Sequence, residues 1–420
     1  MGLSPAQGNV SSSPAAAAAD DWGVTFVCPP AAAGSNTSLL LHDSVVADLP
    51  LSPVGALVTF VNCSRVAIVD SAFERLSAAG AAASAHGAVM VVGSNITETL
   101  YLLGTNCSRV HGASGFACVL AASMITQQQD SAAVIIRDSR FINNSVSAAL
   151  IRNRLRVECI EGTTTTSLAS GGYGALLVYG VRRVTVHSSQ FGFNRGACGG
   201  AVSLIGGGDA SSLVSSGAAL TLVAGGTLSL VNGDVSSLIS GSGLSSLLSG
   251  GSGSAGGKMD MDVQGTSAFN NTANNGAVFF VGAQATLTAT FTASTMVNNT
   301  AWPWGGVFYL AARATLALAL HDGSQMNDND ARWGGVVYMA PGSTLSTWSL
   351  DSGSSVSRNR VYFNGAVIYM SAESALGTWS LDGGSSVNGN SAYSGSSVVN
   401  GNGAYGGSGL GGDGGVVRFG

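Results

Sequence analysis

The sequence predicts an all-β protein, a single-stranded parallel β-helix with about 30 residues per coil and three short strands in each coil. Two observations favour this fold class. Short motifs recur at a nearly constant interval through the C-terminal third of the chain. Between them, apolar and polar residues alternate with a period of two, which is typical of strands. A unit with so few strands cannot bury its own apolar face, so each unit must stack on the next.

The first recurring motif is a Gly-Gly or Gly-Ala pair followed by an apolar strand. Its last aromatic positions recur once per expected coil: Phe280, Tyr309, Tyr338 and Tyr369. Alternation within 307–310 places Phe308 and Leu310 on one face and Tyr309 on the other. The tyrosine column is therefore expected outside. Two apolar columns are expected to form the core, namely Phe308/Val337/Ile368 and Leu310/Met339/Met370.

The second recurring motif ends in an asparagine, a residue that suits turns with positive φ. These asparagines recur at almost the same interval: Asn299, Asn329, Asn359 and Asn390. In stacked coils they would lie above one another at one turn, so we expect a ladder of hydrogen bonds from coil to coil. A third, alternating motif holds Trp348 and Trp379 in phase with Leu350 and Leu381, and both indoles are predicted to lie in the core.

Composition and repeat regularity divide the chain into four segments. Looser copies of the motifs precede the regular ones, for example at 134–144 and 184–202. The predicted segments are an Ala- and Pro-rich tail with any cap (1–44), irregular β-helix coils (45–205), a Gly/Ser/Leu-rich low-complexity insertion (206–257) and regular coils (258–420). Residues 1–5 lack the features of a signal peptide, and we interpret the chain as a segment of a longer protein.

Charge and hydropathy argue against nucleic acid as a partner and against a membrane-spanning helix. Charged residues make up 9% of the chain and the formal net charge is −5, which excludes a basic nucleic-acid footprint. No apolar run reaches the length of a membrane-spanning helix, so we expect no transmembrane segment in this chain.

Six cysteines, none with metal-site spacing, suit disulfides in an oxidising compartment with fifteen possible connectivities, although buried free thiols are an open alternative. Asn-x-Ser/Thr sequons permit secretion and N-glycosylation, and they begin at Asn9, Asn36, Asn62, Asn95, Asn106, Asn143, Asn270 and Asn298.

One further pattern carries a family resemblance. Phe191 and Asn194, followed by the Gly-Gly-Ala-Val string at 199–202, match the pair Phe-x-x-Asn and Gly-Gly-Ala-Val, and Phe141 and Asn144 match its first half. The pair resembles the repeats of chlamydial polymorphic outer membrane proteins, related β-helix proteins of protists and algae, and the pectin-lyase-like fold. The resemblance implies a right-handed coil and a surface or secreted protein, often an adhesin. Any membrane association would depend on a segment outside these residues.

Enzymes with pectin-lyase-like folds need clustered carboxylates. The best acidic column is Asp322, Asp351 and Asp382, which recur at close to the coil interval. Each lies in a Gly/Ser turn where the aspartate would cap its own backbone, which we take as its role. Asp328 and Asp330 flank Asn329 and are interpreted as solvated turn charges, with a cation site as the alternative. The histidines of His42-Asp43 and His321-Asp322 are expected to point away from the adjacent aspartate. We therefore predict no catalytic residue, metal or cofactor.

The aromatic columns are the remaining candidate binding site. Trp302, Trp304 and Trp333 precede the glycine turns, and Phe363 lies near the same phase. Exposed aromatic stacks suit sugar rings or a protein partner. The binding residues are predicted to be Tyr309, Tyr338, Tyr369, Trp304 and Trp333. The expected function is a non-enzymatic surface or secreted β-helix whose lateral surface binds a protein or glycan of a cell surface or matrix. A carbohydrate-active enzyme or carbohydrate-binding module is the alternative.

Overall fold

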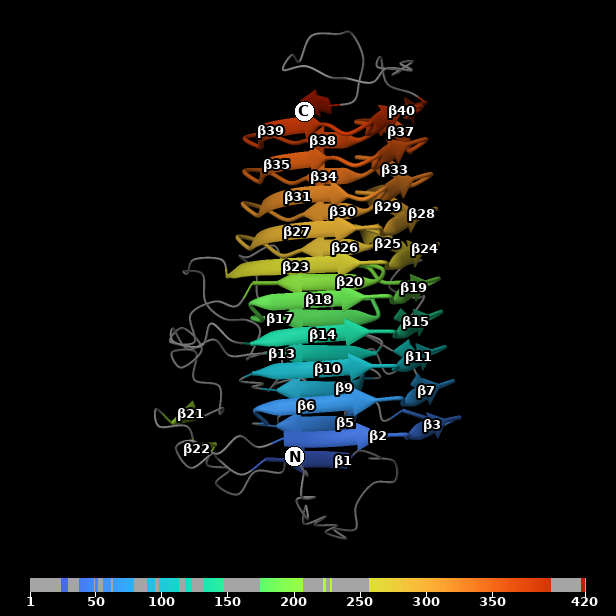
Figure 1. Cartoon of the computed structure of the whole chain (residues 1–420), viewed down its shortest axis with the longest axis vertical. Helices are drawn as coiled ribbons and strands as arrows, with labels where there is room; N and C mark the ends of the chain where they lie inside the picture. Colours follow the sequence, from blue (N-terminus) through green and yellow to red (C-terminus); the bar gives the residue numbers. More distant parts are fainter. Residues whose placement is uncertain are drawn as a thin grey trace.

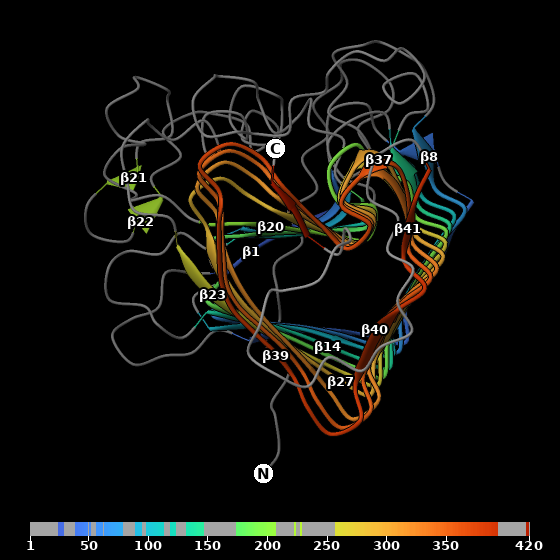
Figure 2. The same ribbon diagram turned by 90° about the horizontal axis from the view of Figure 1, so that it is seen from above.

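The computed structural model describes residues 24–28, 38–48, 50–51, 56–61, 63–78, 89–94, 98–112, 118–122, 132–146, 174–206, 222–223, 227–228, 257–393 and 417–419. These residues contain strands and turns but no helix. They form a parallel β-solenoid that rises from the N-terminal to the C-terminal end in stacked coils (Figure 1). Seen from the C-terminal end, the chain runs counter-clockwise as it rises toward the viewer, so the coil is right-handed (Figure 2).

Four parallel sheets run along the solenoid, and we name them A to D in the order in which the chain passes through them. Sheet A contains β1 (Val24–Val27), β5 (Ala56–Val61), β9 (Val89–Ser94), β13 (Val119–Ala122), β17 (Leu176–Tyr179), β20 (Val202–Ile205), β26 (Phe279–Val281), β30 (Phe308–Leu310), β34 (Val337–Met339), β38 (Ile368–Met370) and β42 (Val417–Phe419). Sheet B contains β2 (Ser38–His42), β6 (Arg65–Val69), β10 (Thr99–Leu103), β14 (Ala133–Arg137), β18 (Arg183–His187), β23 (Lys258–Gln264), β27 (Thr286–Thr292), β31 (Thr315–His321), β35 (Thr344–Leu350) and β39 (Ala375–Leu381).

Sheet C contains β3 (Val45–Ala47), β7 (Ala72–Glu74), β11 (Asn106–Ser108), β15 (Arg140–Ile142), β19 (Gln190–Gly192), β24 (Ser267–Phe269), β28 (Thr295–Val297), β32 (Gln325–Asn327), β36 (Ser355–Ser357) and β40 (Ser386–Asn388). Sheet D adds a fourth short strand to most coils, beyond the expected three. It has a four-stranded part and a five-stranded part, which Arg195 joins by single bridges to Ser145 and Thr272. The first part is β4 (Pro50–Leu51), β8 (Ser77–Ala78), β12 (His111–Gly112) and β16 (Ser145–Val146), and the second is β25 (Thr272–Asn275), β29 (Thr300–Trp304), β33 (Asp330–Trp333), β37 (Arg360–Asn364) and β41 (Ser391–Ala392).

The core is a continuous apolar column inside the sheets. Phe308 pairs in register with Val337, and Leu310 pairs with Met339, and all are buried. Both predicted apolar columns are confirmed. Trp348 is fully buried and stacks on Trp379 at 5.0 Å, while Trp379 is only partly buried against the same core.

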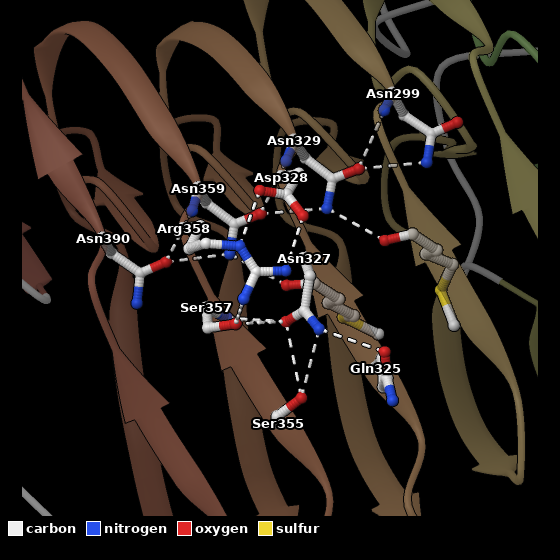
Figure 3. Close-up of polar contacts among 12 residues, drawn as sticks. Asn299, Gln325, Asn327, Asp328, Asn329, Ser355, Ser357, Arg358, Asn359 and Asn390 are labelled. Carbon is white, nitrogen blue, oxygen red and sulfur yellow. Dashed lines mark hydrogen bonds and ion pairs between the residues drawn. The ribbon is translucent and has the colours of Figure 1, made fainter.

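The predicted asparagine ladder is confirmed (Figure 3). Each ladder side chain accepts two hydrogen bonds from the ladder residue one coil below, one from its backbone N–H and one from its side-chain amide. Its own amide then reaches down to a backbone carbonyl, as Asn329 Nδ2 does to Met296 at 3.0 Å. The ladder extends further toward the N-terminus than the sequence spacing indicated, through Asn144, Asn194 and Asn271.

A second buried ladder, of hydroxyl groups, runs along the corner between sheets B and C. This ladder was not predicted from the sequence. The backbone N–H of Ser294, for example, donates to Ser324 Oγ at 3.1 Å, and Ser294 Oγ donates to the Val263 carbonyl at 3.2 Å. At this corner a Ser or Thr follows the residue with positive φ, and the members include Thr105, Ser139, Ser189, Thr266, Ser294 and Ser324.

The boundaries of the solenoid differ in part from the predicted segments. Strands β1 and β2 already pair with β5 and β6, so the solenoid begins before residue 45. Gly206 and Gly257 lie side by side, since a Cβ added to Gly206 would lie 2.8 Å from the Gly257 nitrogen. The two ends of the predicted insertion therefore lie next to each other. Apart from the small antiparallel hairpin β21 (Leu222–Val223) and β22 (Thr227–Leu228), the insertion lies outside the described residues.

The described cysteines form disulfides and are not free thiols. Cys28 is bonded to Cys63, and Cys107 to Cys118. Cys198 is disulfide-bonded as well. All five of these cysteines are buried at the core, and the two bonds with known partners tie neighbouring segments of the N-terminal coils together.

Candidate functional site

The five aromatic residues predicted to bind a partner lie together where sheet D turns into sheet A. Tyr309, Tyr338 and Tyr369 stack face to face, with ring centroids 5.3 and 5.2 Å apart. Their expected place outside the strand needs correction, because Tyr309 is only 2% exposed and the other two are half-buried. The cause is Trp304 at the end of β29, whose ring lies 6.1 Å from Tyr309 and 5.5 Å from Tyr338.

Trp304, Trp333 and Phe363 form a second row, of which Trp304 contacts two of the tyrosines. Trp304 and Trp333 are paired in register and their rings lie 6.5 Å apart, and the Trp333 and Phe363 rings stack at 4.7 Å. The Trp333 and Phe363 rings are stacked, whereas Trp304 and Trp333 are tilted by 33° against each other.

A third, outer row was missed by the sequence analysis. It consists of Trp302, Arg332, Tyr362 and Tyr393, each three residues after a ladder asparagine. That constant offset was the signal that could have found it. The exposed fractions are 51% for Trp302, 49% for Tyr362 and 68% for Tyr393, and these are three of the six large apolar side chains that are exposed among the described residues. We call this row the outer aromatic row.

Arg332 lies in the middle of the outer aromatic row. Its guanidinium carbon lies 4.3 Å from the centre of the Trp302 ring and 5.7 Å from that of Phe363. Cation–π attraction of this kind holds the charge over the rings. Its Nε is buried and has no hydrogen-bond partner among the described residues. An unpaired buried donor is costly to the fold.

The charges beside this corner belong mostly to structural pairs. Arg358 holds Asp328 in a two-point ion pair at 2.8 and 2.7 Å, and these hydrogen bonds lower the pKa of Asp328. Partial burial raises the pKa of Asp330, against the opposing effect of Arg360. Asp328 therefore differs from the solvated turn charge expected from the sequence, whereas Asp330 is exposed, as expected.

The predicted acidic column does not form a cluster. Asp351 and Asp382 occupy the same position in successive coils, but His321 lies in register below Asp351, so Asp322 is displaced by one residue. Asp322 is one residue too close in sequence to Asp351 to share its column. Asp382 accepts a 2.7 Å hydrogen bond from the Gly383 N–H, as the turn-capping interpretation expected.

Two histidine contacts were not foreseen. His321 Nδ1 lies 2.7 Å from Asp351 Oδ2 across one coil. His42 Nδ1 lies 2.8 Å from Asp43, because the strand ends at His42 and Asp43 turns back with φ of 49°. The ligating atoms of His42, Asp43 and Asp70 all lie within 4.8 Å of one another. All three side chains are exposed, and we assign no metal to them.

One open groove lies outside the aromatic corner. Its volume is about 460 Å³, and its lining residues are Glu74, Ser108, Arg109, Ile142, Asn143 and Phe193. It is located beside the turns that follow sheet C and contains a single carboxylate. Neither Asp351 nor Asp382 borders it.

No protein-family model, curated protein or solved structure matches this chain. Only the fold class, a parallel β-solenoid, is therefore shown by the structure. The resemblance to polymorphic outer membrane and pectin-lyase-like proteins gains no support from these comparisons. Among the described residues, no helix is long and apolar enough to cross a membrane.

Proposed function

We propose that this chain is a non-enzymatic surface or secreted β-helix protein whose outer aromatic row binds a protein partner on a cell surface or matrix. The observation that carries the proposal is the row itself. Trp302, Arg332 and Tyr362 follow one another coil by coil on a rigid sheet, and two of the three are about half exposed. Trp, Tyr and Arg are the residues that dominate binding energy at protein interfaces.

A protein partner suits this surface better than a sugar ring. Stacking on a sugar needs a free aromatic face, and the inner rows use their faces on one another. Arg332 covers one face of Trp302. The outer aromatic row offers exposed aromatic area at Trp302, Tyr362 and Tyr393 beside the cation of Arg332, and Trp, Tyr and Arg are enriched at the centre of protein interfaces.

The surface or secreted location has two supports. Buried disulfides suit an oxidising compartment. The Phe-x-x-Asn and Gly-Gly-Ala-Val motifs, which resemble repeats of polymorphic outer membrane proteins, favour the same location.

The test is binding of the purified chain to panels of matrix proteins and of glycans, with and without Ca²⁺. We expect saturable binding to a protein ligand that the double variant Trp302→Ala/Tyr362→Ala loses. Phe193→Ala is the matched control, because Phe193 has the same 51% exposure as Trp302 on a different ridge. Thermal melting of each variant confirms that the fold is retained.

Two outcomes would contradict the proposal. Binding confined to glycans would favour a carbohydrate-binding module. Cleavage of an acidic polysaccharide that Asp351→Ala abolishes would make the protein an enzyme of the pectin-lyase-like kind.

A further inference from the structure

Three sequons share one geometry at the turn that follows sheet C. Asn143, Asn270 and Asn298 are exposed and have positive φ of 57°, 52° and 55°. Their backbone N–H groups bond to the next coil, as Asn143 does to the Gly192 carbonyl at 2.8 Å. Their side-chain amides have no hydrogen-bond partner among the described residues. The backbone is therefore fixed while the amide nitrogen faces solvent.

The ladder supplies the rest of each sequon. The middle residue is in each case a fully buried ladder asparagine: Asn144, Asn271 and Asn299. The third residue is the Ser or Thr that opens the next strand of sheet D: Ser145, Thr272 and Thr300. A left-handed turn position alone tolerates Asn for backbone reasons. Its combination with an exposed amide and a hydroxyl two residues later is what a glycosylation acceptor requires.

We propose that Asn143, Asn270 and Asn298 are N-glycosylation sites, so that glycans line the ridge between sheets C and D. The inference rests on the secreted or surface location in the proposed function. In the transfer, Nδ2 attacks the anomeric carbon of an N-acetylglucosamine carried on a lipid pyrophosphate. The new C–N bond forms, the sugar–phosphate bond breaks, the lipid pyrophosphate leaves with its electron pair, and Nδ2 loses one proton to a base.

Asn106 provides an internal contrast. Its sequon is equally complete in sequence, but Asn106 is half-buried in β11, and its Nδ2 donates to Glu74 Oε1 at 2.8 Å. Asn106 is paired in register with Ala72 below and Arg140 above. A glycan there would break this bond and enter the sheet. The folded protein is therefore expected to carry none at Asn106.

The Asn143 site also has room for its first sugar. Asn143 borders the 460 Å³ groove, whose walls include Phe193 and Arg109. Phe193 is half exposed and is fixed by an edge-to-face contact with Phe269 at 5.5 Å. An apolar ring beside hydrogen-bonding groups suits the two faces of an N-acetylated sugar. The first sugar on Asn143 is thus expected to contact the walls of the groove, and the first sugar on Asn298 is expected to be exposed to solvent.

The experiment directs the full 420-residue chain into the secretory pathway of a eukaryotic cell and maps its glycopeptides. We expect glycans on Asn143, Asn270 and Asn298 and none on Asn106. Thr300→Val should remove one glycan without touching the asparagine, and Asn298→Asp should do the same while keeping the turn. Asn106→Gln should leave the glycan mass unchanged. Bare asparagines at the three sites, or a glycan on Asn106 in folded protein, would overturn the proposal.

A second measurement uses the folded glycoprotein. Enzymatic release of the glycan should be slower at Asn143 than at Asn298, and Phe193→Ala should abolish the difference. Equal rates in the parent protein would refute the role of the groove. Both measurements are independent of partner binding, so a glycosylated chain that binds no protein would refute only the proposed function.

Discussion

Asn329 Oδ1 accepts hydrogen bonds from both the backbone N–H and the side-chain amide of Asn299, one coil below, and each is 3.0 Å long. Both residues are fully buried, so water cannot replace these bonds. The ladder therefore joins successive coils at a point where the backbone turns and sheet hydrogen bonds are interrupted.

Removal of one ladder side chain should destabilise the protein strongly. Asn329→Ala leaves two buried donors of Asn299 unpaired, and an unsatisfied buried group costs about 1–3 kcal/mol. It also removes the amide bond to the Met296 carbonyl, whereas Asn359 Oδ1 keeps the hydrogen bond from the backbone N–H of residue 329. We expect a loss of about 3 kcal/mol or more in urea-induced unfolding. Asn298→Gly is the control variant, because residue 298 is exposed and glycine suits its positive φ. This change should alter the free energy of unfolding by less than about 0.5 kcal/mol. Equal effects of the two variants would show that the ladder is dispensable.

The glycine turns are expected to differ in their tolerance of a methyl group. A Cβ on Gly335 would overlap the Ala366 carbonyl oxygen of the next coil, so the coils would have to separate. Gly323 has positive φ of 72° but nothing within 4 Å of the added Cβ. Gly335→Ala should cost about 2–3 kcal/mol by steric overlap, and Gly323→Ala about 1 kcal/mol by backbone strain alone. Thermal unfolding of the two variants checks this order, which a larger loss for Gly323→Ala would contradict.

Two aspartates on either side of Asn329 should titrate in opposite directions. The hydrogen bonds from Arg358 lower the pKa of Asp328, so the stability that this carboxylate contributes is complete above its unfolded pKa and is lost as pH falls through its folded pKa. Burial raises the pKa of Asp330, so its protonation favours the folded state, and that stability is lost as pH rises through its folded pKa.

NMR titration of the aspartate carboxyl carbons measures both groups. Asp328 should titrate below its ordinary pKa and Asp330 above it. Arg358→Gln should return Asp328 toward the ordinary value, because the variant removes the charge and the two-point contact. An unchanged Asp328 titration in this variant would exclude Arg358 as the cause.

The two disulfides with known partners should stabilise the N-terminal coils to different extents. Cys28–Cys63 spans 35 residues, and Cys107–Cys118 spans 11. In the chain-entropy description, the longer loop stabilises by about 1 kcal/mol more than the shorter. The double variant Cys28→Ala/Cys63→Ala should therefore lose more stability than Cys107→Ala/Cys118→Ala, as measured by denaturant unfolding. The reverse order would mean that local packing outweighs chain entropy.

Much of the regular part could be predicted because each solenoid coil contacts only its neighbours. Because the coil length is nearly constant, residues one coil length apart can be assigned to the same column from the sequence, as for Asn299, Asn329 and Asn359. Where insertions lengthen the spacing, the signal fails. Asn144 and Asn194 are adjacent ladder residues 50 positions apart, and Asn194 and Asn271 are 77 apart.

The sequence by itself determined the class of fold, the core columns and the regular ladder, since alternation and repeat length depend on local geometry. The tertiary structure decided what surrounds each column. Trp304 covers Tyr309, His321 instead of Asp322 lies in register below Asp351, and Arg332 occupies the space beside Trp302. Exposure and partners depend on how corners fold over neighbouring coils and on one-residue shifts in register. Such shifts arise from three-dimensional packing, which no single repeat encodes.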